Sequence, residues 1–179
     1  MLNNQLIKNH STGCLFFALL IAITLPLTVN ASSADSTKPI KIEAGKVVIK
    51  EKQGISYYSG KVKIAQGSRL ISGETIRIYS KKNEITKIVI AGKPAFFSQL
   101  NDASEKTIAR AKEMVFHVKK EILVLKKEAV LQQKDNIFRS ERISYNTAKD
   151  IMMAGDKNAP ANQRVKITIH PKKESKSIK

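Results

Sequence analysis

Side chains able to carry acid–base, nucleophilic or metal chemistry are few in this chain of 179 residues. Cys14 is the one cysteine, and of three histidines only His117 and His170 lie beyond the apolar leader described below. Neither stands at a spacing typical of a Ser–His–Asp triad or a zinc site. The acids near them are spread among lysines, which favours solvation over paired acid–base work: Glu113, Glu121, Glu128, Asp135 and Glu141. We therefore expect no enzyme, no cofactor and no metal.

The charge of the chain favours anionic partners. It carries 32 Lys and Arg against 15 Asp and Glu, a formal net charge of +17. Such an excess attracts nucleic acid, anionic lipid or a phosphorylated glycolipid. Trp is absent and aromatic residues make up 6% of the chain, so a stacking platform for single-stranded nucleic acid is not expected. The signal for export described next also disfavours nucleic acid.

Residues 1–31 have the three-part pattern of a secretory signal peptide. The first thirteen residues carry Lys8 and no acid, 14–27 are mostly apolar, and Val29-Asn30-Ala31 resembles a signal-peptidase site. We expect cleavage after Ala31. A lipid-modified cysteine follows the apolar run of its signal, whereas Cys14 stands at the start of the run. We therefore expect Cys14 to be removed with the leader. The alternative is an uncleaved membrane anchor, for which the apolar run is short.

The stretch from Gly60 to Phe97 alternates apolar, mostly β-branched residues with polar ones. Such a period of two is typical of half-buried antiparallel strands, here with one apolar face and one face of Lys and Arg. Turn residues interrupt it at Gly67, Gly73, Lys82-Asn83 and Gly92. Further strands are predicted at Ile40–Glu43, Lys46–Ile49, Ile55–Tyr58 and Val165–Ile169, with turns at Ser59-Gly60 and Gly92–Pro94. Some sixteen short runs result, which indicates an all-β sandwich, barrel or jelly roll.

One segment, 111–131, also fits a helix. Its apolar residues recur at helical spacing: Ala111, Met114, Val115, Val118, Ile122, Leu125 and Ala129. The rival interpretation alternates Met114, Phe116 and Val118 in a strand, then turns at Lys119–Glu121 into a strand over 122–125. Periodicity leaves both open.

An internal echo favours the strand interpretation. At an offset of 67 residues, the sequence from Gly60 aligns with that from Lys127, and Gln66 meets Gln133. Apolar positions match as well, including Ile64 with Leu131 and Ile76 with Ile143, and Ile88–Gly92 is answered by Ile151–Gly155. Such self-similarity is typical of a repeated β unit.

The chain also resembles the OstA-like family. The motifs that carry the resemblance stand in the family's order: Pro39–Glu43, Ser59–Gly67, Gly92–Phe97 and Ala129–Gln133. The resemblance spans 38–170 and implies an open, twisted antiparallel β jelly roll of about sixteen strands. It also implies a periplasmic protein that binds lipopolysaccharide, taking lipid A acyl chains inside. The residues after 170 are expected to form a basic, disordered tail.

The resemblance further implies assembly. Head-to-tail copies would form a bridge from an inner-membrane LptC-like partner to an outer-membrane LptD-like partner. Two alternatives stay open: a membrane-anchored LptC-like domain of the same pathway, and an exported polyanion-binding β module without a lipid pocket. A chain of LptD type is not expected, because no large membrane barrel fits this length.

Two sets of residues follow from these expectations. The lipid-binding interior is predicted from the alternation and the family motifs: Ile40, Ile42, Val62, Ile64, Ile76, Ile78, Ile88, Ile90, Phe97, Met114, Phe116, Val118, Leu123 and Leu131. The oligomer edges are predicted on the terminal strands, whose backbone groups an open sheet leaves free: Ile40, Lys41, Ile42, Val165, Ile167 and Ile169.

Overall fold

The computed structural model describes residues 34–101, 103–156, 160 and 163–171. The expected signal peptide (1–31) and residues 172–179 of the expected tail lie outside these ranges. Within them, none of the helical segments has the length and apolar character needed to span a bilayer.

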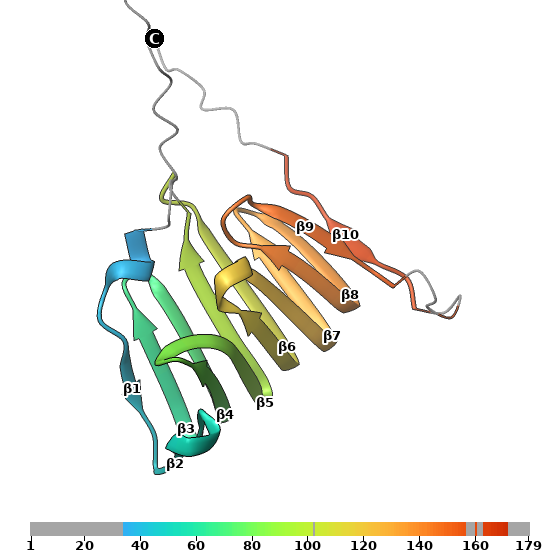
Figure 1. Cartoon of the computed structure of the whole chain (residues 1–179). Coiled ribbons are helices and arrows are strands. Elements are labelled where there is room, and N and C mark those ends of the chain that lie inside the picture. Colours follow the sequence, from blue (N-terminus) through green and yellow to red (C-terminus); the bar gives the residue numbers. More distant parts are fainter. Residues whose placement is uncertain (1–33, 102, 157–159, 161–162, 172–179) are drawn as a thin grey trace, which may run out of the picture. The chain divides into compact units, whose positions relative to one another are not determined.

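The described residues form one antiparallel sheet of ten strands, with no α-helix (Figure 1). The strands are β1 (Lys41–Glu43), β2 (Lys46–Lys50), β3 (Ile55–Gln66), β4 (Arg69–Lys81), β5 (Glu84–Leu100), β6 (Lys106–His117), β7 (Ile122–Gln133), β8 (Asn136–Asn146), β9 (Ile151–Ala154) and β10 (Lys166–Thr168). Three 3₁₀ turns complete the set: η1 (Ala34–Thr37), η2 (Glu51–Gln53) and η3 (Val118–Lys120). Neighbours follow the order β1-β3-β4-β5-β6-β7-β8-β10, with β2 also paired to β3 and β9 to β8. The all-β, open antiparallel expectation is confirmed.

A line of β-bulges crosses the six long strands near their middles. Register shifts fall between Ser59 and Val62 in β3, and then at matching levels in each successive pair up to β7 and β8. A bulge adds a residue to one strand and bends it. Because the bulges are aligned, every long strand bends at the same level, and the sheet divides into two layers along this bulge line.

The pairing of the short strands identifies the layers. The first layer holds β1, β10 and the long-strand segments 62–66, 69–73, 95–100, 106–111, 129–133 and 136–140. The second layer holds β2, β9 and the segments 55–59, 75–81, 84–91, 113–117, 122–126 and 142–146. The two layers face each other, since the ring centroids of Phe97 in the first and Phe116 in the second lie 5.9 Å apart.

Alternation along each strand decides which side chains lie between the layers. In β3, Val62 and Ile64 are buried, whereas Lys61 and Lys63 are exposed. The same period continues through β4 to β8, so one continuous apolar cluster fills the interior. The two-faced ribbon expected from the sequence is confirmed.

Several expected boundaries are wrong. Ser59-Gly60, Gly73 and Gly92–Pro94 do not reverse the chain: they lie at bulges inside β3, β4 and β5. The described part of the chain has ten strands and not about sixteen, because six long strands bend once without ending. The terminal strands are also shorter than expected, with Ile40, Val165 and Ile169 outside β1 and β10.

The ambiguous segment is a pair of strands, β6 and β7, and the helical interpretation is wrong. Val118 leaves the predicted strand and begins η3, and Glu121 ends this turn with a left-handed φ of 51°. Antiparallel pairing of Met114 with Leu125 and of Phe116 with Leu123 joins the two strands.

The internal echo is confirmed by backbone geometry. Gly60 and Lys61 have φ angles of 83° and 51°, and their counterparts Lys127 and Glu128 have 62° and 55°. At the next turn Gly67 has 57° and its counterpart, Lys134, has 53°. The β3–β4 and β7–β8 pairs therefore share both the bulge and the turn.

The bulge line generates a prediction about Gly73. A Cβ atom here would lie 2.7 Å from the carbonyl oxygen of Ala91 and 2.8 Å from Cγ2 of Ile90. We expect Gly73→Ala to lower the free energy of unfolding in urea by about 1–3 kcal/mol, because β4 and β5 must separate locally. Gly45→Ala is the control: its nearest atom is 3.5 Å away, and a change within about 0.5 kcal/mol is expected. Equal losses in the two variants would contradict the role of the bulge line.

Candidate functional site

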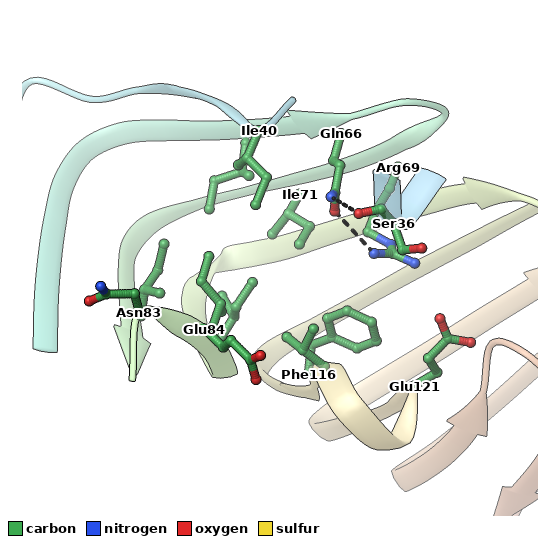
Figure 2. A pocket seen from close by; sticks show the side chains of 14 residues that line it. Ser36, Ile40, Gln66, Arg69, Ile71, Asn83, Glu84, Phe116 and Glu121 are labelled. Atoms are coloured by element: carbon green, nitrogen blue, oxygen red, sulfur yellow. Dashed lines mark hydrogen bonds between the residues drawn. The ribbon is translucent and has the colours of Figure 1, made fainter. Parts of the chain in front are cut away.

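A cavity of about 370 Å³ lies between the layers, near the turns that join β3 to β4 and β4 to β5 (Figure 2). Its lining comes from both layers and from the segment before β1: Ser36, Ile40, Ile64, Gln66, Arg69, Ile71, Ile78, Asn83, Glu84, Ile85, Ile88, Phe116, Val118 and Glu121. Most of this surface is apolar, and its polar residues lie in or beside turns. Such a cavity is suited to an apolar chain with a polar group attached.

The walls of the cavity follow directly from the alternation in the strands. Ile64 and Ile71 are cross-strand partners in the first layer, and Ile78 and Ile88 are partners in the second. Phe116 pairs with Ile88 and is 1% exposed. Because the bulge line folds one layer over the other, these five side chains surround a common apolar space.

The segment before β1 is held beside this cavity by side-chain hydrogen bonds. The Asp35 carboxylate accepts from the backbone N–H of Ser68 at 2.7 Å and from its hydroxyl at 2.6 Å. Nε2 of Gln66 donates to the carbonyl oxygens of Ser36 and Lys38, each at 3.2 Å. Gly67 must lack a side chain here, because a Cβ atom would collide with Asp35. This attachment places Ile40, which is 43% exposed, at the cavity wall.

One cation belongs to the cavity wall. Arg69, the first residue of β4, is 5% exposed. Its Nε donates to Oε1 of Gln99 at 3.1 Å, and its Nη1 donates to Oε1 of Gln66 at 3.4 Å. Burial lowers the pKa of Arg69 from its ordinary value, and the charges of Glu121 and Asp35 oppose this shift. The cavity thus combines an apolar wall with a buried guanidinium.

The predicted lipid-binding residues divide into two groups. Six of them line the cavity: Ile40, Ile64, Ile78, Ile88, Phe116 and Val118. The others pack in the interior without lining it: Ile42, Val62, Ile76, Ile90, Phe97, Met114, Leu123 and Leu131. Alternation identifies which residues face inward, but not where the two layers separate enough to leave space.

Sequence reasoning missed the polar part of the lining. Ser36, Gln66, Arg69, Asn83, Glu84 and Glu121 lie beside or within turns and were not predicted, nor were Ile71 and Ile85. Ile71 could have been predicted from the sequence, since it lies across from Ile64 in the β3–β4 pair. Arg69 carries no such signal, because an arginine after a Gly-Ser turn ordinarily lies in solvent. Glu121, expected among solvated acids, is half-buried at the cavity.

Away from the cavity, the layers are joined by a polar seam of Asn101, Thr107, Gln133, Tyr145 and Asp150. The Tyr145 hydroxyl, from the second layer, lies 3.3 Å from Oγ1 of Thr107 in the first. Tyr145 donates to Asp150 at 2.7 Å, and Gln133 donates to the same carboxylate at 2.6 Å. Asn101 adds a longer contact of 3.5 Å. Polar contacts therefore add to the apolar core where the layers meet near Tyr145.

The predicted oligomer edges lie at the ends of the sheet order. Lys41 and Ile42 belong to β1, which pairs with β3 alone, and Ile40 precedes this strand. Ile167 belongs to β10, which pairs with β8 alone and is flanked by Val165 and Ile169. Ile167 is 55% exposed. Among the described residues, each strand therefore has one side without a neighbouring strand.

The two histidines lie apart and outside the cavity lining. His117 ends β6, where burial and then the charges of Lys120, Lys87 and Lys126 lower its pKa. His170 has its Nδ1 2.6 Å from the carbonyl oxygen of Asp135. In the described part of the chain, His, Cys, Asp and Glu form no group of three suited to a metal ion.

Comparison with known proteins identifies relatives of one kind. The family model described as LptA/(LptD N-terminal domain) LPS transport protein matches residues 41–151. The chain is 31% identical over 170 residues to the lipopolysaccharide export system protein LptH of Pseudomonas aeruginosa, covering 90% of this chain and 95% of that protein. It is 28% identical over 137 residues to the lipopolysaccharide export system protein LptA of Escherichia coli K12, covering 75% and 73%.

The fold agrees with these relatives. The crystal structure of LptH, described as the LptA homologous periplasmic component of the lipopolysaccharide transport device of Pseudomonas aeruginosa, superposes with a TM-score of 0.71. The match has 29% sequence identity and covers 76% of this chain and 99% of the LptH chain.

The polar seam generates a pH prediction. Burial, with a further contribution from Asp150, raises the pKa of Tyr145 from 10.0 to about 12. A raised folded-state pKa gives stability that is fully present below pH 10 and is lost as the pH rises through about 12, where the phenol ionises in the fold. Tyrosinate absorbance should show a late ionisation step near pH 12 that Tyr145→Phe removes. An unchanged titration in that variant would contradict the buried seam.

Proposed function

We propose that this chain, which belongs to the LptA/(LptD N-terminal domain) family of LPS transport proteins, binds lipopolysaccharide in the periplasm and carries it toward the outer membrane. The observation that supports this best is the cavity between the layers, apolar in its walls and joined to an apolar interior. Acyl chains of the lipid would lie against Ile64, Ile71 and Phe116. The chain acts in this proposal as a carrier and not as an enzyme.

Apolar burial, not charge, would hold the cargo. Each methylene removed from water contributes about 0.8 kcal/mol, so four methylenes contribute roughly 3 kcal/mol. An ion pair between an exposed lysine and a phosphate contributes only about 0.2–1 kcal/mol and is screened by salt. The exposed lysines of the outer faces, such as Lys61 and Lys63, would therefore guide and orient the phosphorylated head group.

The free strand edges support assembly. Among the described residues, the order of strands in each layer ends without closing, at β1 and β2 on one side and at β9 and β10 on the other. Backbone groups on such edges are templates for pairing with another chain. Copies joined head to tail through β1 and β10 would extend the apolar interior from one copy to the next. The LptC-like inner-membrane protein and the LptD-like outer-membrane protein would pair with the ends of this bridge.

Periplasmic location in this proposal rests on the predicted leader and on the relatives. Cleavage after Ala31 would release the β domain, which begins near residue 38, into the periplasm. If the leader stayed attached, the same domain would act as a membrane-anchored LptC-like member of the pathway. Sequencing the N-terminus of the exported protein distinguishes the two: a first residue at Ser32 supports release, and an intact leader supports the anchored form.

Photocrosslinking tests where the lipid lies. We expect a photoreactive amino acid in place of Phe116, or of its partner Phe97, to crosslink to lipopolysaccharide in cells, because both rings lie between the layers. The same amino acid in place of Lys63 should give no crosslink, because this side chain is exposed on the outer face. Crosslinks of equal yield at the three positions would contradict the assignment of inside and outside.

Light scattering tests the assembly edge. We expect oligomers of the wild-type protein to grow with concentration and to be absent in Ile167→Pro, because proline removes a backbone donor from β10. Ile167→Ser is the matched control, since it loses the apolar side chain but keeps the N–H group, and it should still form oligomers. Oligomers that persist in Ile167→Pro would move the contact away from β10.

A further inference from the structure

Arg69 is an unusual residue for the wall of an apolar cavity. The residue is 5% exposed, yet it borders the space lined by Ile40, Ile71 and Phe116. Figure 2 shows its guanidinium between the Gln66 and Ser36 side of the cavity and the side of Phe116 and Glu121. A buried cation is costly unless it is paired and fully hydrogen-bonded.

The protein satisfies only part of this guanidinium. Nε and Nη1 donate to the amide oxygens of Gln99 and Gln66, and the guanidinium carbon lies 4.9 Å from the centre of the Phe116 ring. Nη2 is buried and has no hydrogen-bond partner among the described residues. The guanidinium thus contacts two neutral amide oxygens and one aromatic ring, and its Nη2 donor has no acceptor among the described residues.

No nearby carboxylate takes up this donor. The Asp35 carboxylate is held by the N–H and hydroxyl groups of Ser68. Glu121 attracts Arg69 electrostatically, but the two form no ion pair among the described residues. Gln66 cannot turn its amide around without losing its bonds to Ser36 and Lys38, so its oxygen stays fixed toward Arg69. Among the described residues, Nη2 of Arg69 therefore lacks an acceptor.

We propose that Nη2 of Arg69 is an anchor for a phosphate monoester on the sugar head of the lipid cargo. This inference rests on the proposed function, since it assigns one polar group of the cargo to one atom of the cavity. A guanidinium suits a phosphate, whose oxygens accept charge-assisted hydrogen bonds. The apolar lining around it suits a phosphate attached to an acylated molecule better than a free anion. The anchor would fix the direction in which the lipid enters, with the head at Arg69 and acyl chains along Ile71 and Phe116.

A thermodynamic cycle that combines two lipids with two protein variants tests the anchor. Dissociation constants are measured for lipopolysaccharide and for the same preparation with its lipid A phosphates removed, using wild-type protein and Arg69→Met. Wild type should prefer the phosphorylated lipid by about 10- to 100-fold, the usual worth of a hydrogen bond to a charged group. In Arg69→Met this ratio should fall close to one. The ratio, not either affinity alone, is the quantity that the anchor determines.

Control variants separate the anchor from general charge and from folding. Arg77→Met removes a cation from the exposed outer face and should keep the wild-type ratio. Thermal unfolding of Arg69→Met should occur at or above the wild-type temperature, because a methionine replaces an incompletely paired buried charge. If this variant fails to fold, Arg69→Lys replaces it in the cycle. A lysine keeps the charge but not the planar donors, and it should reduce the preference without abolishing it.

Other outcomes would overturn the proposal in distinct ways. An unchanged ratio in Arg69→Met would place phosphate recognition elsewhere, and if both affinities fell equally Arg69 would be an ordinary wall residue. Saturable binding of inorganic phosphate by wild type, lost in Arg69→Met, would assign the site to a free anion. Failure of wild type to bind either lipid would instead contradict the proposed function itself.

Discussion

The alignment of the β-bulges is the constraint on which the rest of the structure depends. A flat sheet of these strands would leave its apolar face in water, because the described part of the chain supplies no α-helix to cover it. Bending every long strand at one level turns the sheet upon itself, so that the two halves bury each other. This arrangement does not require the edge strands to pair with each other, and β1 and β10 keep one free side each within the described residues.

The fold thus separates two requirements that a lipid carrier must meet together. Tight contacts such as Phe97 with Phe116 and the polar seam around Tyr145 hold the layers together. The space beside Arg69 and Ile71 remains open, and polar residues of turns and strand ends form part of its lining. Cargo binding would use the open part and leave the packed part unchanged.

Much of the fold could be predicted from the sequence because its main signal is local. Alternation in β3 to β5 identifies the inward face, and the echo between Gly60 and Lys127 identifies the repeat, whose two copies share left-handed backbone at the bulge. The continuity of the long strands could not be predicted. Gly60, Gly73 and Pro94 are residues typical of turns, and only the long-range pairing shows that the strands continue through them.

The site was predicted less completely, because it depends on contacts between residues far apart in the chain. Inward residues follow from period two, but the position of a cavity depends on how two distant layers meet. Arg69 is surrounded by residues distant in the chain: it contacts Gln99 and Phe116, and the adjacent β3–β4 turn is bonded to Asp35, thirty-three residues before Ser68.

The retention of lipopolysaccharide as salt is raised tests the central claim most directly. We expect the complex to survive gel filtration at about 0.5 M salt, where screening acts within a few Å and burial of acyl chains is unaffected. Release of the lipid at this salt, with tight binding at low salt, would contradict the account and would favour an ionic binder of polyanions.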